Sequence, residues 1–106
     1  MKRRFVIGVD GLTASKSKSF REYLGSLGGW WHWIENFWLL ITENEDVAVD
    51  KIRDQAKALG ANRVVVFEFP EEVDWTTSGP RNSKGRPMGD WLKTTWAGAV
   101  SEDDGK

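Results

Sequence analysis

Apolar residues in the first two-thirds of the chain form short runs of strand length, which alternate with stretches of helical spacing. The runs occupy residues 5–9, 30–34, 37–41 and 63–69. The first and third are apolar at consecutive positions, which predicts strands in the centre of a sheet. The second contains His32, which favours an edge strand.

Two helices are predicted between these runs. Ser19 and Glu22 have the spacing of a capping box, so the first helix is expected over 19–27, after a loop at 12–18. Apolar residues recur on one face of 45–59 and charged residues on the other, which predicts the second helix.

The resulting order, β-α-β-β-α-β, predicts an α+β fold of the ferredoxin-like type, in which the two β-α-β units interlock. Two helices cover only one face of a four-stranded antiparallel sheet. The other face is then either solvated or buried by a partner, and the abundance of tryptophan favours burial.

After Pro70 the composition shifts to a polar loop rich in Gly and Pro. Pro87 lies where the first residue of a helix is expected. The residues that follow have apolar side chains at helical spacing: Met88, Trp91, Leu92 and Trp96. The chain is therefore predicted to form one domain over residues 1–96, including a C-terminal helix, followed by a flexible acidic tail at 97–106.

Four of the seven tryptophans lie in the segment 28–42. The segment alternates about Glu35 and Asn36, as two antiparallel strands joined by a tight turn do. Soluble monomers rarely expose a large aromatic patch, so we expect a twofold homodimer that buries one sheet face. Its predicted interface residues are Trp31, His32 and Trp33.

Charge and composition exclude several kinds of site. The formal net charge is −1, which gives no global attraction to nucleic acid or to an acidic membrane. The absence of cysteine excludes disulfides and thiolate metal sites, and a single histidine excludes a histidine-rich one. No apolar run approaches the roughly 20 residues of a membrane span, so a cytoplasmic protein is expected.

Asp10 is the strongest candidate for chemistry, because it ends a buried strand and precedes a glycine. Magnesium prefers oxygen ligands and keeps several waters, so one carboxylate from each of two chains would suffice for a shared ion. The alternative is that Asp10 only makes a turn with its own backbone. His32 also has two interpretations: it is either a general base or a packing residue.

Six basic residues lie in two polar segments and are predicted to contact phosphate: Lys16, Lys18, Arg21, Arg81, Lys84 and Arg86. If the two segments converge, they form a local phosphate-binding surface on a neutral protein. The alternative is two separate solvated loops.

The chain resembles the small SinR-like proteins, relatives of the dimeric CRISPR-associated subunit that helps to acquire new spacers. The resemblance covers about residues 4–96. It rests on a strand ending in aspartate, a Gly-Trp-Trp-His block, an Ile-Arg-Asp triplet and a final Trp-Leu helix, found here at Asp10, 29–32, 52–54 and 91–92. The chain departs from the family in a longer basic loop at 79–87 and in Glu35-Asn36-Phe37 at the hairpin turn.

The resemblance implies a ferredoxin-like protomer that pairs sheet to sheet. It also implies a nucleic-acid-interacting protein of antiviral defence in which Asp10 serves a magnesium-dependent nuclease; several members of the family are inactive structural binders. Two other functions remain open: a non-catalytic protein-interaction module, such as a toxin–antitoxin partner or a phage-borne inhibitor of a host complex, and a purely structural dimer.

Overall fold

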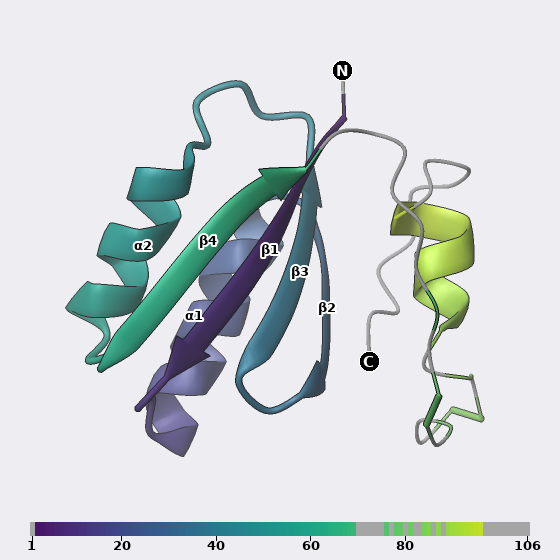
Figure 1. The fold of residues 1–106 in the computed structure, drawn as a ribbon, viewed down its shortest axis with the longest axis horizontal. Helices are drawn as coiled ribbons and strands as arrows, with labels where there is room; N and C mark the ends of the chain where they lie inside the picture. The colour runs from purple at the N-terminus through teal and green to yellow at the C-terminus, as the bar shows by residue number, and fades with distance from the viewer. Residues whose placement is uncertain are drawn as a thin grey trace.

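A four-stranded antiparallel sheet and two helices form the main body of the protein in the computed structural model (Figure 1). The structure describes residues 2–69, 76, 78–79, 81, 84–85, 87 and 89–96. The elements are β1 (Arg3–Asp10), α1 (Ala14–Leu27), β2 (Gly29–Ile34), β3 (Phe37–Thr42), α2 (Val49–Ala58), β4 (Arg63–Phe69) and the short π-helical segment η1 (Leu92–Trp96). The predicted α+β class is confirmed.

The strands lie in the order β2-β3-β1-β4, with every neighbouring pair antiparallel. The runs predicted as central strands are β1 and β3, and both are central. The run with His32 is β2, and it lies at an edge as predicted.

Both long helices pack on one face of the sheet, where they form the main core (Figure 1). Phe5 and Ile7 of β1 are fully buried against this layer. Phe20 of α1 meets Trp38 of β3 edge to face, with ring centroids 5.3 Å apart, a favoured aromatic geometry. Among the described residues, no helix is both long and apolar enough to cross a membrane.

Helix α1 begins five residues earlier than predicted, at Ala14 rather than Ser19. Thr13 is the N-cap, and its hydroxyl accepts a hydrogen bond from the backbone N–H of Lys16 (3.2 Å). Ser19 lies inside the helix, where its hydroxyl donates to the Ser15 carbonyl. The predicted loop at 12–18 was therefore wrong, because an earlier cap was available to the same helix.

Helix α2 begins at Val49, four residues later than predicted. The Asn44 side chain accepts a hydrogen bond from the backbone N–H of Asp46 (2.8 Å), which stabilises a turn in place of the first helical turn. Val47 still reaches the core from this loop.

The other face of the sheet is hereafter called the outer face, and the described residues cover one half of it. η1 and the preceding Trp91 lie against the outward side chains of β2 and β3. The buried residues of this second core are Trp31, Leu39, Ile41, Trp91, Leu92 and Trp96. Three residues of the apolar stripe predicted for the C-terminal helix, Trp91, Leu92 and Trp96, are thus buried within the same chain, and Met88 lies outside the described residues.

Arg4 projects from β1 onto the outer face and is only 1% exposed. Its Nε donates a hydrogen bond to the Trp96 carbonyl at the end of η1. Its two Nη atoms are buried and have no hydrogen-bond partner among the described residues. The basic start of the chain therefore contributes a buried anchor for η1, which the sequence pattern did not indicate.

Candidate site at the end of β1

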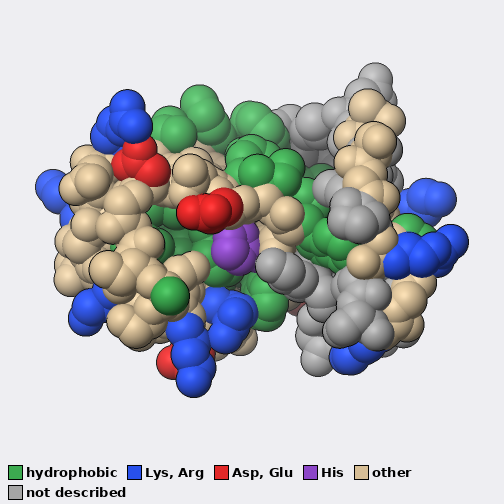
Figure 2. Space-filling model, turned by 90° about the horizontal axis from the view of Figure 1, so that it is seen from below, with side chains coloured by type: hydrophobic (Ala, Val, Ile, Leu, Met, Phe, Trp, Pro, Cys, Tyr) green, Lys and Arg blue, Asp and Glu red, His purple; other side chains and the backbone are tan. Residues whose placement is uncertain are grey.

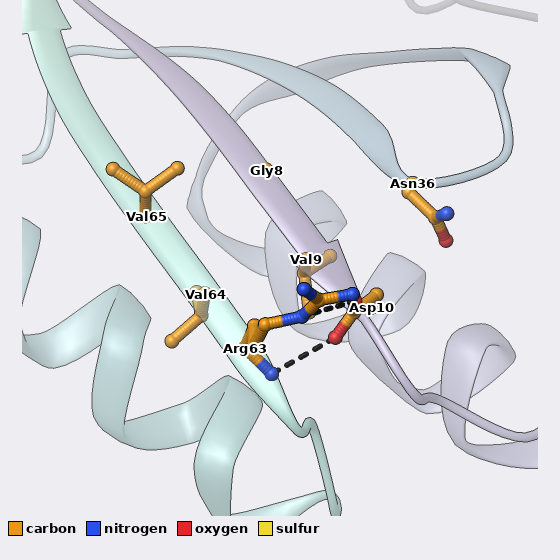
Figure 3. A pocket seen from close by; sticks show the side chains of 7 residues that line it. All are labelled: Gly8, Val9, Asp10, Asn36, Arg63, Val64 and Val65. Atoms are coloured by element: carbon orange, nitrogen blue, oxygen red, sulfur yellow. Dashed lines mark hydrogen bonds and ion pairs between the residues drawn. The ribbon is translucent and has the colours of Figure 1, made fainter.

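Asp10 ends β1 and is held by Arg63, the first residue of β4 (Figure 3). The backbone N–H of Arg63 donates to Asp10 Oδ1 (2.9 Å), and its side-chain Nε donates to Oδ2 (2.8 Å). The Nη2 atom completes the ion pair with Oδ2. The antiparallel register sets these two residues directly opposite each other, so the pairing of β1 and β4 positions the contact.

The hydrogen bond from the Arg63 side chain holds the pKa of Asp10 below its usual value, and the opposite charge adds to the effect. The same contact raises the pKa of Arg63. Asp10 is therefore ionised at neutral pH. The Arg63 side chain is 87% exposed, so one edge of its guanidinium binds Asp10 while the rest faces solvent.

A shallow hollow lies beside this pair. Its lining comes from the ends of β1 and β4 and from the hairpin turn, and comprises Gly8, Val9, Asp10, Asn36, Arg63, Val64 and Val65 (Figure 3). Gly8 forms part of its floor. A Cβ atom at this position would lie 3.1 Å from the Val65 side chain, so Val65 packs closely against residue 8 and a side chain there would crowd it.

The described residues of one chain show no cluster of metal-ligating side chains around Asp10. Both carboxylate oxygens of Asp10 already accept hydrogen bonds from Arg63. The described residues contain no group of three or more His, Cys, Asp or Glu side chains that could hold an ion. The catalytic and magnesium-binding roles of Asp10 remain predictions.

The two basic segments lie on different layers of the molecule. Lys16, Lys18 and Arg21 are on α1, in the helical layer, whereas Arg81 and Lys84 precede the C-terminal helix on the opposite side (Figure 1). Viewed from the end of the sheet where β1 finishes, Lys and Arg side chains form separate groups on the two sides (Figure 2). Arg86 lies outside the described residues.

The turn that carries Arg81 is closed on itself. The Arg81 Nη1 atom donates to the Gly85 carbonyl (2.8 Å), and residues 81 and 87 form an isolated antiparallel bridge. Lys16 and Lys18 are exposed on the first turns of α1. One surface built from both basic segments is therefore not present among the described residues.

The three residues predicted at a dimer interface do not share a surface. Trp31 is 2% exposed and belongs to the core beneath η1. Trp33 packs partly against the same core. The His32 ring stacks on Trp38 with centroids 3.4 Å apart, and its Nε2 donates to the Glu35 carbonyl (2.8 Å). These contacts within the chain account for all three positions, and their role at an interface remains a prediction.

A pair of exposed apolar side chains lies instead on the other half of the outer face, over β1 and β4. Val65 and Phe67 are each 51% exposed. Val6 of β1 lies opposite Phe67 in the register, and Phe69 stacks on Phe67 with centroids 5.8 Å apart. We call this surface, formed by Val6, Gly8, Val65, Phe67 and Phe69, the open half of the sheet; Val6 lies at its border and also packs against the second core.

Arg63 and the open half are the features that sequence reasoning missed. The run 63–69 was predicted correctly as a strand, but its pairing partner was not assigned. The adjacency of β1 and β4 is what brings Arg63 to Asp10 and leaves Phe67 at an edge. The available signal was the period-2 alternation of Arg63, Val65 and Phe67, which places them on one face.

Comparison of the chain with protein-family models, with curated proteins and with solved structures gives no match in any of the three.

Proposed function

We propose that the chain is a small nucleic-acid-interacting protein with a ferredoxin-like protomer, and that it acts as a homodimer related to the SinR-like family. The element order and the sheet order β2-β3-β1-β4 support the protomer assignment. The open half of the sheet supports a dimer, because an apolar patch at a sheet face is a typical site of association.

The observation that carries the nucleic-acid proposal is a group of exposed cations near one end of the sheet. Arg63 begins β4 beside the end of β1, and α1 starts only four residues after Asp10. Lys16 and Lys18 are exposed there, and the first turn of α1 contains no acidic residue. Exposed basic side chains near a helix N-terminus favour contact with phosphate oxygens.

Binding of this kind is dominated by phosphate contacts, so it depends steeply on salt and little on sequence. We expect fluorescently labelled DNA and RNA of unrelated sequences to bind with similar affinity at low salt. The measurement is fluorescence anisotropy across a salt series. The double variant Lys16→Glu/Lys18→Glu should lower the affinity and the salt slope.

The matched control reverses the charge of two lysines on α2 in the double variant Lys51→Glu/Lys57→Glu. It changes the net charge by the same amount as the α1 variant, but on another helix. Equal loss in both double variants would mean that only net charge matters. Reversal of Lys84 tests the second basic segment separately, because that segment lies on the other layer. A chain that binds neither DNA nor RNA at low salt would overturn the proposal.

The open half of the sheet favours a second candidate function, a non-catalytic protein-interaction module. Val65 and Phe67 are half exposed, and neither is needed for phosphate contact. In this case Phe67→Ser would abolish association, and the original chain would not bind nucleic acid.

The magnesium-dependent nuclease is tested by incubating DNA and RNA with the chain, with and without magnesium, and with Asp10→Ala as control.

A further inference from the structure

The outer face of β1 and β4 carries three cross-strand pairs whose members complement each other in size or charge. The register sets a small residue opposite a large one and an acid opposite a base, in the pairs Val6 and Phe67, Gly8 and Val65, and Asp10 and Arg63. Period-2 alternation places all six on the outer face. This arrangement has a consequence for self-association.

We propose that a second copy of this chain packs on the open half of the sheet, with a twofold axis parallel to the strands and midway between β1 and β4. This inference rests on the homodimer of the proposed function and specifies which residues of the two copies face each other, that is, the register of the interface. A rotation about this axis exchanges the positions of β1 and β4. Each residue of one strand then faces its own cross-strand partner from the other copy.

In this register the two surfaces fit in shape. The partner copy's Val65 faces the hollow that Gly8 helps to line, and the smaller Val6 faces the larger Phe67 of that copy. Each contact occurs twice, as twofold symmetry requires. Sheets packed face to face lie about 10 Å apart, a spacing set by side chains that interdigitate in this way.

The charges are also complementary. Asp10 of one copy faces Arg63 of the other, so two carboxylates and two guanidinium groups alternate at the end of the interface. Arg63 uses Nε and Nη2 for its own Asp10 and is 87% exposed, which leaves its outer edge available to a second carboxylate. The group has no net charge, so it contributes specificity of register without repulsion.

The covered half of the outer face is compatible with this arrangement. η1 and Trp91 pack on the outer face of β2 and β3, so this layer ends beside the open half. Because the rotation exchanges β1 and β4, the partner copy's β2 and β3 extend beyond the free edge of β4, away from that layer. The partner copy's sheet and this C-terminal helix then lie side by side in one layer.

Mixing two charge-reversed variants tests the register. Asp10→Arg alone places arginine against arginine across the interface, and Arg63→Asp alone places aspartate against aspartate. A mixed dimer restores two Asp–Arg contacts between copies while each chain keeps a like-charged pair of its own. In a statistical mixture the mixed dimer is as abundant as the two homodimers together. Native mass spectrometry of an equimolar mixture should instead show the mixed dimer about tenfold more abundant than the two homodimers together.

A second mixture avoids the Asp10–Arg63 contact, in case those variants fail to fold. Val6→Lys and Phe67→Glu change positions on the open half, and in this register they face each other only between copies. Their mixed dimer should again exceed its statistical proportion. The matched control combines Val6→Lys with Val49→Glu, which alters an exposed apolar residue on α2, and should give no such excess.

A statistical distribution of dimers in the Val6/Phe67 mixture would overturn this register but leave the homodimer in place. A chain that sediments as a monomer at high micromolar concentration would overturn the register and the homodimer together. Nucleic-acid binding is measured separately by anisotropy, so its outcome does not decide the register.

Discussion

The two halves of the outer face are built from similar strands but differ in how much of their side-chain surface is exposed to solvent. Over β2 and β3, Trp31 is buried under η1, whereas Phe67 on β4 keeps half of its surface exposed. Trp31 and Phe67 are both aromatic, and each lies on a strand whose side chains alternate between the two faces of the sheet. The difference therefore comes from where the C-terminal helix lies and not from the strands themselves.

This comparison separates two uses of apolar surface. The covered half stabilises the monomer, because its aromatic side chains are removed from water within one chain. The open half contributes little to the monomer and has its largest effect when a partner covers it. Variants on the two halves should therefore differ in which measurement they change.

The largest effect is expected from Trp91→Ala on the covered half. Trp91 is 2% exposed and packs with Trp96 at a centroid distance of 6.0 Å, so truncation leaves a large cavity. We expect the free energy of unfolding to fall by about 3–5 kcal/mol in urea titrations. A loss below about 1 kcal/mol would show that η1 does not belong to the core.

A smaller effect is expected at Arg4, which lies below the end of η1. Arg4→Ala should lower stability by about 2 kcal/mol or more, because it removes the packing of a buried side chain. Arg4→Met keeps that packing and removes a buried charge with two Nη atoms unpaired among the described residues. We expect its stability within about 1 kcal/mol of the original chain or above it. Equal losses in both variants would show that the charge itself stabilises the fold.

Phe67→Ser tests the open half. At concentrations where the chain is monomeric, the free energy of unfolding should change by about 1 kcal/mol or less, because the side chain is already half exposed. Self-association, measured by sedimentation velocity, should be lost. A large fall in monomer stability with association unchanged would reverse the roles of the two halves.

The smallest effect concerns the pH dependence of the Asp10–Arg63 contact at the end of the open half. The pKa of Asp10 is lowered in the folded state by its hydrogen bond with Arg63. The stabilisation is therefore complete above the unfolded-state pKa of about 3.9 and is lost as pH falls through the lower folded-state pKa. The stability difference between the original chain and Asp10→Asn should shrink below about pH 4. A difference that stays constant through this range would show that the ion pair adds nothing.

Much of the fold could be predicted because its signals are local. The strand 63–69 was predicted with its observed bounds, and the central positions of β1 and β3 follow from their uninterrupted apolar runs. The start of α1 was wrong because Thr13 and Ser19 are both competent caps, and local sequence does not decide between them. Asp10 was selected correctly as a residue at a strand end, but its partner Arg63 is 53 positions away.

The sequence by itself determined the alternation of apolar positions, the four strands, the tight hairpin turn and the apolar stripe of the C-terminal segment. These depend on periodicity and on turn chemistry over a few residues. Only the tertiary structure decided that η1 covers β2 and β3, that Arg4 is buried beneath it and that Arg63 holds Asp10. Each of these is a contact between segments far apart in the chain, and its free energy depends on strand order and packing, which local patterns do not contain.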